Sequence, residues 1–278
     1  MSGKVREAAC VVVFNHLEQI LFVKRPKTSK AWANVMVFPG GKVDASDDNG
    51  HPSPLPHVPI RFLNAAIREL FEEVDIGLTT PSLYGHFTQE ERRQWRKKIV
   101  QGETCFDEVT RSLQCTLRHE ALVPFHQVTT PVGSPHRFDT WFFLTQISQA
   151  AAAQVETDGL ELEELLWLTP KDALDGYAAG NFMFATPQFY LLHHLRQFDS
   201  WNHLVSTAKA QAKTPQPSVL PQRIPPSAEF PGTLTAFPGD PLYEPRIAFP
   251  FLHRVYLHPT DPAKSSVHLP PVLPSRIK

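Results

Sequence analysis

The chain contains 278 residues, of which 27 are basic and 28 acidic, so its formal net charge is −1. This balance creates no global field that would attract nucleic acid or a membrane surface, and we expect neither as a partner. No apolar run approaches the ~20 residues of a membrane-spanning helix, and residues 1–7 lack the apolar region of a secretory signal. The hydrophobic share of 42% is typical of a globular domain with one sizeable core.

Apolar patterning predicts strands and helices in alternation along most of the chain. Short apolar or alternating runs predict strands, and apolar residues at i, i+3, i+4 and i+7 predict helices. The predicted strands lie near residues 7–14, 20–25, 35–38, 137–147 and 163–168, and the predicted helices near 59–75, 170–179 and 186–198. Strands interleaved with helices that cover two faces indicate an α/β fold, an α/β/α sandwich around a mixed β-sheet.

The helix predicted near residues 59–75 has an apolar face and an acidic face. The apolar face is formed by Ile60, Leu63, Ile67, Leu70, Phe71 and Val74. Because an α-helix turns about 100° per residue, Glu69, Glu72 and Glu73 fall within an arc of roughly 100° on another side. Such crowded acids repel one another unless a cation lies among them, and oxygen-only ligands suit Mg²⁺ or Mn²⁺ better than zinc. The helix therefore predicts a divalent-metal site, although an isolated acidic triplet is more often a solvated surface.

Two glycines before this helix complete a longer pattern. The run Phe38-Pro39-Gly40-Gly41 follows a predicted strand, where paired glycines indicate a sharp turn or a close approach of the backbone. Together with the helix it resembles the Nudix box, G-x5-E-x7-R-E-U-x-E-E-x-G-U, in which U is aliphatic. In this resemblance Gly41 takes the first position, Asp47 the first acid, and Arg68-Glu69-Leu70 with Glu72-Glu73 the remainder of the motif.

The segment departs from the box in three ways. Asp47 replaces glutamate, which keeps the charge and shortens the reach. The seven-residue spacer becomes residues 48–67, which include a loop rich in proline and histidine. Asp75 stands where the box has glycine, and a left-handed backbone at a helix end costs a non-glycine residue about 1 kcal/mol, less for Asp than for most. None of these changes removes the three glutamates of the helix.

A partial resemblance to a second signature lies just upstream. The spacing from Leu21 to Gly41 is similar to L-L-T-x-R-S-x3-R-x3-G-x3-F-P-G-G, found before the box in Nudix enzymes that cleave coenzyme A. Arg25 matches the first arginine, and Lys30 replaces the second. These cations would offset the charge of an anionic substrate, or they are ordinary surface cations at the end of a strand. Residues 137–144 and 167–174 also look like the acyl-coenzyme A diphosphatase branch, whose members are often peroxisomal.

The resemblance implies Mg²⁺- or Mn²⁺-dependent hydrolysis of a diphosphate linkage in coenzyme A or acyl-coenzyme A. The products would be 3′,5′-ADP and 4′-phosphopantetheine or its acylated form. Glu69, Glu72 and Glu73 would bind the metal, and Arg68 would hold Glu72 in position. Glu161, in the loop before a predicted strand, and Glu69 itself are both candidates for the proton acceptor.

The remaining predicted contacts surround the diphosphate. The backbone at Gly40 and Gly41 would contact metal or phosphate, and Arg25 and Lys30 would contact the substrate. Two alternatives stay open: a Nudix diphosphatase that acts on ADP-ribose, nucleotide sugars or dinucleotides, and a non-catalytic Nudix module that binds a nucleotide or a partner protein.

A polar, helix-like insertion is predicted from residue 89 to about 122, between the acidic helix and the next strand. It is expected to form a cap over the site. Its dense basic cluster consists of Arg92, Arg93, Arg96, Lys97 and Lys98. With helical spacing these side chains form either a solvated helix face or a site for the 3′-phosphate of coenzyme A.

The composition changes after residue 212, so we predict a Nudix hydrolase domain over residues 1–212 and a proline-rich C-terminal extension over 213–278. Proline breaks helices and central strands, yet residues 233–237 and 247–257 keep apolar residues that predict a wrapped extension with a hairpin. It is a candidate dimer arm, which makes a homodimer a possible assembly. Cys10, Cys105 and Cys115 are expected to be free thiols. Free thiols indicate a reducing compartment, so we expect an intracellular location, cytoplasmic or organellar (peroxisome or mitochondrion). Residues 275–278 are not of the S-K-L type, which departs from the peroxisomal relatives.

Overall fold

The computed structural model describes residues 4–25, 35–157, 164–215, 217–246 and 251–270. Its helices are α1 (Ile60–Val74), α2 (Leu83–His86), α3 (Gln89–Val100), α4 (Phe106–Ser112), α5 (Gln149–Ala152), α6 (Pro170–Ala178), α7 (Thr186–Leu195) and α8 (Trp201–Gln211), with short 3-10 turns η1 (Ala45–Asp47), η2 (His119–Ala121) and η3 (Pro262–Lys264). Its strands are β1 (Val5–Phe14), β2 (Ile20–Lys24), β3 (Val35–Val37), β4 (Gly40–Lys42), β5 (Thr79–Thr80), β6 (Thr116–Leu117), β7 (Val123–Thr129), β8 (Arg137–Gln146), β9 (Glu164–Leu168), β10 (Met183–Phe184), β11 (Gln222–Ile224), β12 (Thr233–Ala236), β13 (Arg254–Leu257) and β14 (Ser266–His268).

A curled mixed sheet forms the centre of the molecule. Within the described residues it contains eight strands, in the order β10-β3-β2-β1-β8-β7, with β4 also paired to β1 and β9 to β2. The long strands β1 and β8 run parallel over their whole length, from the pair Val5–Arg137 to the pair Phe14–Gln146. The other pairs with β1 are antiparallel, so the predicted mixed sheet is confirmed.

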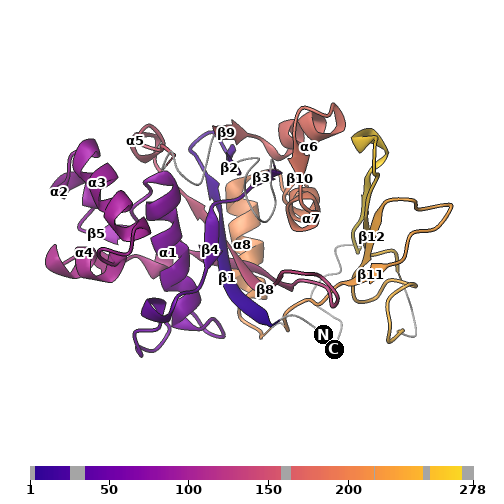
Figure 1. Ribbon diagram of the computed structural model, residues 1–278, viewed down its shortest axis with the longest axis horizontal. Helices are drawn as coiled ribbons and strands as arrows, with labels where there is room; N and C mark the ends of the chain where they lie inside the picture. Colours follow the sequence, from indigo (N-terminus) through magenta and orange to yellow (C-terminus); the bar gives the residue numbers. More distant parts are fainter. Residues whose placement is uncertain (1–3, 26–34, 158–163, 216, 247–250, 271–278) are drawn as a thin grey trace.

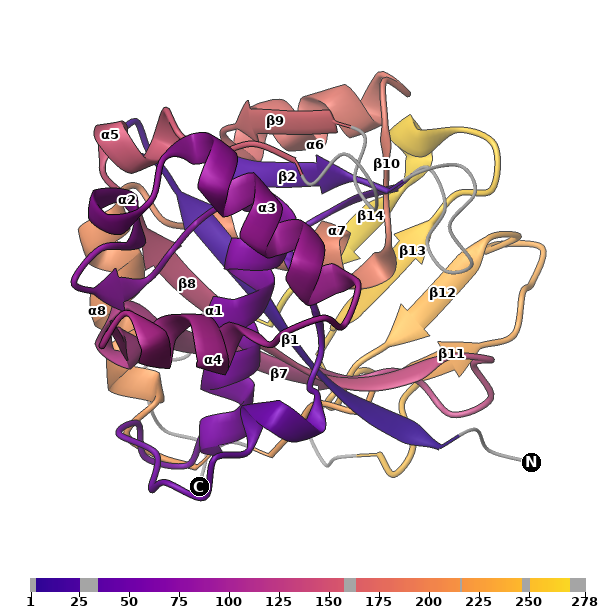
Figure 2. The ribbon, with the colours of Figure 1, turned by 60° about the vertical axis from the view of Figure 1, so that its left-hand side comes forward.

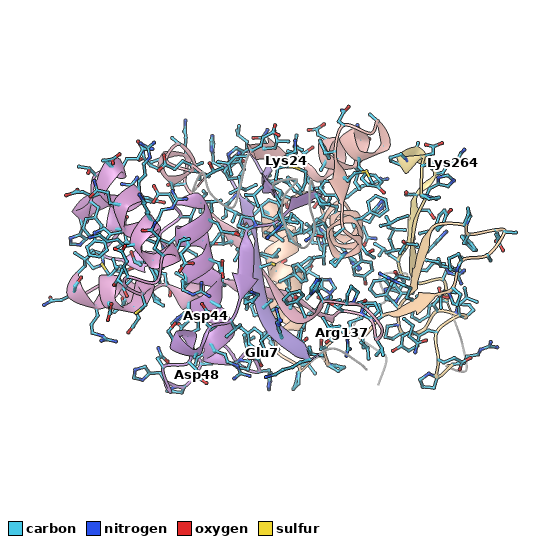
Figure 3. All side chains as sticks on the ribbon, viewed as in Figure 1. Glu7, Lys24, Asp44, Asp48, Arg137 and Lys264 are labelled. Carbon is cyan, nitrogen blue, oxygen red and sulfur yellow. The ribbon has the colours of Figure 1, made fainter. Side chains whose placement is uncertain are left out.

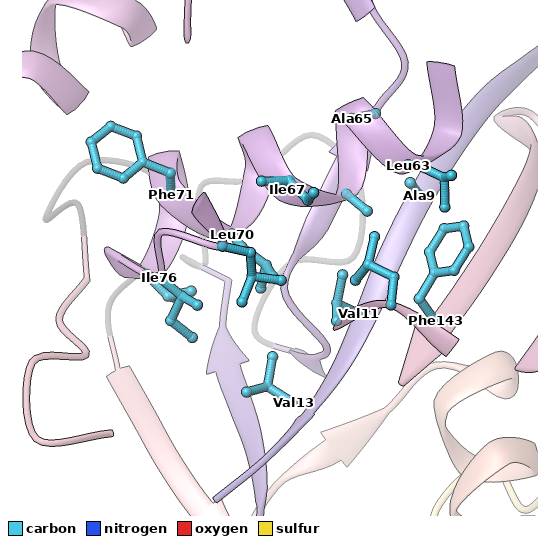
Figure 4. Close-up of a cluster of buried hydrophobic side chains, with 14 of the residues drawn as sticks. Ala9, Val11, Val13, Leu63, Ala65, Ile67, Leu70, Phe71, Ile76 and Phe143 are labelled. Carbon is cyan, nitrogen blue, oxygen red and sulfur yellow. The ribbon is translucent and has the colours of Figure 1, made fainter. Parts of the chain in front are cut away.

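Alternating side chains of β1 bury both faces of this sheet. Val11 and Val13 belong to the core beneath α1, whereas Val12 and Phe14 belong to the core beneath α6, α7 and α8. Helices on both sides explain why β1 reads as a nearly continuous apolar run rather than an alternating one. Figure 1 shows α1 on one side of the sheet and α7 with α8 on the other, which is the predicted α/β/α arrangement. Figure 4 shows Ile67 and Leu70 of α1 packed toward β1.

The insertion predicted over residues 89–122 contains α3, α4 and β6, and β6 pairs with β5, which precedes the insertion. Together they form a small subdomain beside α1. Figure 2 shows α3 and α4 lying along the outer side of α1. A capping box at Thr88 and Glu91 begins α3, because each residue satisfies a backbone N–H of the other. The insertion is therefore placed where a wall of the predicted site is needed.

The C-terminal extension folds into a four-stranded antiparallel sheet in the order β11-β12-β13-β14, within the residues described there. The pairing of β12 with β13 agrees with the predicted hairpin. Phe237 and Val255 from this sheet join the same core as α7 and β1. The extension is thus packed on the domain, and the dimer arm stays a prediction.

The state of the cysteines and the lengths of the helices bear on two further expectations. All three cysteines are free, as predicted. Within the described ranges, no helix combines the length and the apolar character needed to cross a bilayer.

Candidate active site

Helix α1 supports the three glutamates on a rigid element, since its apolar side is fully buried against the sheet. The helix ends at Asp75, whose backbone is left-handed with φ 57° and ψ 33°. The Asp75 N–H bonds to the Phe71 carbonyl at 3.2 Å, and the Ile76 N–H bonds to the Leu70 carbonyl at 3.0 Å. A left-handed residue whose N–H bonds to the carbonyl four residues earlier is the ending usually formed with glycine, so Asp75 adopts the backbone of the residue it replaces.

Arg68 is the centre of the acidic cluster. Its Nε and Nη2 donate to the two carboxylate oxygens of Asp47, each at 3.0 Å. Its Nη1 donates to Glu69 Oε1 at 3.0 Å and to Glu72 Oε2 at 3.1 Å, while Nη2 also donates to the Lys42 carbonyl at 2.8 Å. The predicted pairing of Arg68 with Glu72 is confirmed. Asp47 therefore holds Arg68 through a fork of two bonds, and its shorter side chain still reaches.

Gly40 and Gly41 lie against the carboxylates of Glu73 and Glu69, respectively. The Gly40 N–H donates to Glu73 Oε2 at 2.8 Å. Gly40 has φ 145°, and a Cβ there would lie 2.2 Å from the Ala9 carbonyl oxygen, so only glycine fits between this turn and β1. A Cβ on Gly41 would lie 2.3 Å from Glu69 Oε1, which shows how closely the Glu69 carboxylate approaches this backbone.

Burial and mutual repulsion make two of the acids reluctant to ionise. The pKa of Glu69 rises to about 7, chiefly because the carboxyl is removed from water, with the neighbouring carboxylates adding to the effect. The pKa of Glu72 also rises to about 7, for the same leading reason, and Arg68 opposes the shift in both cases. Extra positive charge at this cluster would lower both pKa values, as a divalent cation does.

The donor chemistry fits Mg²⁺ or Mn²⁺, but the side chains are not arranged around a common point. Among the described residues, no group of three His, Cys, Asp or Glu side chains is placed to hold a metal ion as it stands. Glu73 is directed to Gly40, and Glu69 and Glu72 are directed to Arg68. A bound cation would therefore have to replace Arg68 as the partner of at least one of these carboxylates.

A cavity of about 450 Å³ opens beside the acids and leaves room for an ion and phosphate groups. Its described lining comes from the β3–β4 region, from α1 and from the insertion, and includes Arg25, Gly41, Lys42, Asp44, Ser46, Arg68, Glu69, Glu72, Glu73, Ile99, Val100, Gly102, Thr104, Cys105 and Phe106. In Figure 3, Asp44 lies beside α1, while Lys264 marks the C-terminal sheet at the far end of the molecule. The insertion thus contributes one wall, as the predicted cap requires.

Of the two cations predicted to bind the substrate, Arg25 and Lys30, the structure describes only Arg25. Arg25 lines the cavity, and its Nε is buried without a hydrogen-bond partner among the described residues. A buried guanidinium N–H without a partner is costly, so an anion is the expected occupant. Lys30 and the candidate base Glu161 lie outside the described residues.

The basic cluster was predicted to be either a solvated helix face or a phosphate site, and both predictions are wrong for Arg92 and Arg96. The side chains of Arg92 and Arg96 are only 2–3% exposed, so they form neither a solvated face nor a free phosphate site. Arg96 Nε donates to the Glu72 carbonyl at 2.9 Å, and its Nη2 donates to the Glu73 carbonyl at 3.0 Å. Arg96 therefore caps the C-terminal end of α1, where the helix dipole favours a cation.

Arg92 is the partner of the aspartate that replaces the box glycine. Its Nε lies 3.0 Å and 2.9 Å from the two carboxylate oxygens of Asp75, and both side chains are buried. The guanidinium also donates to the Phe87 carbonyl and to Gln154 Oε1, and it lies 4.7 Å from the centre of the Tyr84 ring. Sequence reasoning missed this pair, although the spacing contained a signal.

That signal is the position of the arginines on α3. Arg92, Arg96 and Ile99 recur at i, i+4 and i+7, and Trp95 adds a fourth side chain to the same side of the helix. This is the spacing of a core-facing stripe, with two arginines in places that apolar residues usually occupy. A buried arginine needs a buried acid, and Asp75 was the one unexplained acid near the site.

The approach of Glu69 to Gly41 gives a direct test of the site. Gly41→Ala should displace the Glu69 carboxylate and lower kcat/KM for diphosphate hydrolysis at least tenfold, with little change in thermal stability because the displaced atoms end a flexible side chain. Gly85→Ala is the matched control, since no atom lies within 4 Å of a Cβ at that position. Equal activity of the two variants would show that the position of Glu69 does not matter.

Comparisons with known proteins identify the family of this chain. The profile of the NUDT19 Nudix domain matches residues 48–195. A Caenorhabditis elegans protein named as a nudix hydrolase is 29% identical over 277 residues, which cover 96% of this chain and 87% of that protein. The Xenopus laevis protein named acyl-coenzyme A diphosphatase NUDT19 is 28% identical over 238 residues, which cover 67% of this chain and 62% of its own length.

A solved structure shows the same fold. The crystal structure of a NUDIX hydrolase from Alicyclobacillus acidocaldarius aligns with a TM-score of 0.58 at 21% identity, covering 76% of this chain and 96% of that one. The family profile covers more than half of the sequence, including the three glutamates and Arg68. The chain therefore belongs to the Nudix hydrolase family.

Proposed function

We propose that this protein is a metal-dependent diphosphatase that hydrolyses coenzyme A or acyl-coenzyme A to 3′,5′-ADP and (acyl-)4′-phosphopantetheine. The observation that carries the proposal is the cavity in which Glu69, Glu72 and Glu73 lie with Arg25, whose Nε has no hydrogen-bond partner among the described residues. A metal–diphosphate complex needs carboxylates to bind its cation and a positively charged side chain to bind its phosphates, and this cavity contains both. Relatives named acyl-coenzyme A diphosphatase support this choice of substrate.

The chain supplies defined groups to the reaction. Mg²⁺ or Mn²⁺, held by Glu69, Glu72 and Glu73, would neutralise charge on the phosphoryl oxygens and lower the pKa of the attacking water. Arg68, fixed by Asp47, positions Glu69 and Glu72 through its Nη1 hydrogen bonds. The remaining steps are binding and proton transfer.

Binding the diphosphate falls to the groups around the cavity. Arg25 would pair with a phosphate, and Gly41, which lines the cavity, places no side chain between the substrate and Glu69. Gly40 lies behind this wall, against β1, and its N–H holds Glu73. Glu69 is a candidate to accept the proton from water, because a cation bound at the cluster would lower its pKa from about 7 and keep it ionised at neutral pH. Glu161 stays an alternative proton acceptor.

Substrate profiling of the purified chain tests the proposal. Coenzyme A, dephospho-coenzyme A, acyl-coenzyme A esters of several lengths, ADP-ribose, a nucleotide sugar and a dinucleotide would be assayed with Mg²⁺ and with Mn²⁺, and the products identified by mass spectrometry. The proposal requires the highest kcat/KM for a coenzyme A compound and release of 3′,5′-ADP. A higher kcat/KM for ADP-ribose or a dinucleotide would assign the protein to that substrate class instead. Binding of a nucleotide without turnover would support the non-catalytic alternative.

Metal binding should depend on pH in a direction set by the raised pKa values. Glu69 and Glu72 have pKa values of about 7 in place of the usual 4.5, so below pH 7 they hold protons that a metal must displace. The apparent affinity for Mn²⁺ should rise about tenfold per pH unit between pH 6 and 7 for each released proton, and level off above. Calorimetry in two buffers of different ionisation enthalpy counts these protons. An affinity that is constant from pH 6 to 8 contradicts the assignment.

A further inference from the structure

The cavity beside the acids has two chemically different sides. One side carries the charged groups, among them Arg25, Lys42 and the three glutamates. The other side is formed by the end of α3, the α3–α4 connection and the start of α4, and the side chains described on it carry no charged group: Ile99, Val100, Gly102, Thr104, Cys105 and Phe106. We call this second side the insertion wall.

Val100 is the exposed apolar member of the insertion wall. It is 38% exposed, whereas Phe106 is buried and Ile99 packs partly against the core. The nearby Lys98 ammonium is directed elsewhere, because it lies 5.0 Å from the centre of the Trp95 ring. An exposed apolar side chain that faces a cavity with charged groups on its other side has a function if an apolar part of the ligand covers it.

The insertion wall is held at a fixed place relative to the acids. Arg96, one turn before Val100, donates to the backbone carbonyls of Glu72 and Glu73. Glu156 accepts from Arg93 at 2.6 Å and from Arg96 at 3.4 Å, which ties α3 to the segment after α5. A substrate whose diphosphate lies at the glutamates would therefore meet this wall on one defined side.

Resting on the proposed function, we propose that the insertion wall receives the pantetheine half of the substrate with its acyl chain, and that Val100 contributes to selection for acylated coenzyme A. The pantetheine arm is an uncharged chain that ends in a thiol or in a thioester with an apolar acyl chain, which matches a neutral, partly apolar surface. The other half carries an additional phosphate, which gains nothing from a wall without cations. The cationic side of the cavity, with Arg25 and Lys42, suits the phosphates.

The test compares how each half of the substrate binds. Val100→Glu places a carboxylate on the insertion wall, and Gln101→Glu adds the same charge at the next, exposed residue outside the cavity lining. Inhibition constants would be measured for octanoyl-4′-phosphopantetheine and for 3′,5′-ADP, together with kcat and KM for octanoyl-coenzyme A and free coenzyme A. Relative to Gln101→Glu, Val100→Glu should weaken inhibition by octanoyl-4′-phosphopantetheine at least tenfold and inhibition by 3′,5′-ADP less than twofold. KM for octanoyl-coenzyme A should rise more than KM for free coenzyme A.

Three results would overturn the inference, and they differ in what they say about the proposed function. If 3′,5′-ADP loses as much affinity as the acylated product, the wall faces the adenosine half, and coenzyme A hydrolysis stands. If Val100→Glu behaves like Gln101→Glu, no part of the substrate touches the wall, and hydrolysis again stands. If the unmodified protein cleaves no coenzyme A compound, the proposed function fails and the inference fails with it. Val100→Ser, which adds no charge, should change the same quantities in the same order by smaller factors.

Discussion

Glu72→Gln is expected to lower kcat/KM for diphosphate hydrolysis at least a hundredfold, equivalent to about 2.7 kcal/mol of barrier. The substitution keeps the size of the side chain and removes the negative charge that a divalent cation requires. Because the pKa of Glu72 is already raised by burial, its ionised form is costly in the metal-free protein. The stability of the metal-free protein should therefore change little while activity is lost.

The control for this experiment is an acid outside the site. Glu120→Gln removes a carboxylate that is 71% exposed and paired only with Arg118 among the described residues, so activity should stay within twofold of the unmodified protein. Circular dichroism and urea unfolding would verify that both variants are folded. Full activity of Glu72→Gln with an active unmodified protein would place the chemistry elsewhere in the chain.

The central sheet and α1 could be predicted from the sequence because their apolar patterns are long and regular. The predicted helix at 59–75 differs from α1 by one residue at each end, and the predicted strand at 137–147 differs from β8 by one residue at its C-terminal end. The acids of α1 share a face for the same geometric reason that its apolar residues do. Local periodicity was therefore sufficient to place the glutamates on one face, whereas the closeness of Gly40 and Gly41 to them was implied by the resemblance to the Nudix box.

Other elements depend on pairing that local patterns do not record. Strand β7 contains Pro124 and a register shift at that point, and proline argues against a strand unless the strand lies at an edge, as β7 does. Strand β4 consists of Gly40, Gly41 and Lys42 and is a strand only because β1 pairs with it. Helix α8 had a signal, a Ser200 cap before Trp201 and Leu204, that the prediction passed over.

The site residues that sequence reasoning misassigned are those whose roles need a distant partner. A cluster of arginines reads as surface unless the buried acid that neutralises it is known, and Asp75 lies 17 residues before Arg92. Asp75, in turn, is an unexplained replacement of the motif glycine until its ion pair with Arg92 is known. Two departures from the expected pattern thus explain each other.

Arg92→Met should destabilise the fold by about 3–5 kcal/mol, because it leaves the Asp75 carboxylate buried without its cation. Methionine keeps most of the apolar stem, so the loss reports the charge rather than the volume. Asp75 already has a pKa raised to about 6 by burial, with Arg92 as the leading opposing influence. Urea unfolding, followed by circular dichroism, measures the change in free energy of unfolding.

The pH dependence distinguishes an unpaired acid from simple loss of packing. Without Arg92 the folded-state pKa of Asp75 rises further above its unfolded value of 3.8, so the folded state binds the extra proton. When the folded-state pKa of a carboxyl is raised, the free energy of unfolding falls as the pH rises from the unfolded-state pKa through the folded-state pKa. Arg92→Met should therefore be more destabilised at pH 8 than at pH 5.5, and an equal loss at both would indicate packing alone.

Replacing both partners should restore much of the lost stability. In Arg92→Met/Asp75→Gly the buried charge is gone, and glycine adopts the left-handed backbone at the end of α1 without strain. The double variant should recover at least half of the loss and show little dependence on pH. Arg93→Met, on the exposed side of the same helix, should cost far less than Arg92→Met. If the double variant is as unstable as the single one, Asp75 and Arg92 do not act as a pair, and the aspartate in place of the motif glycine needs another explanation.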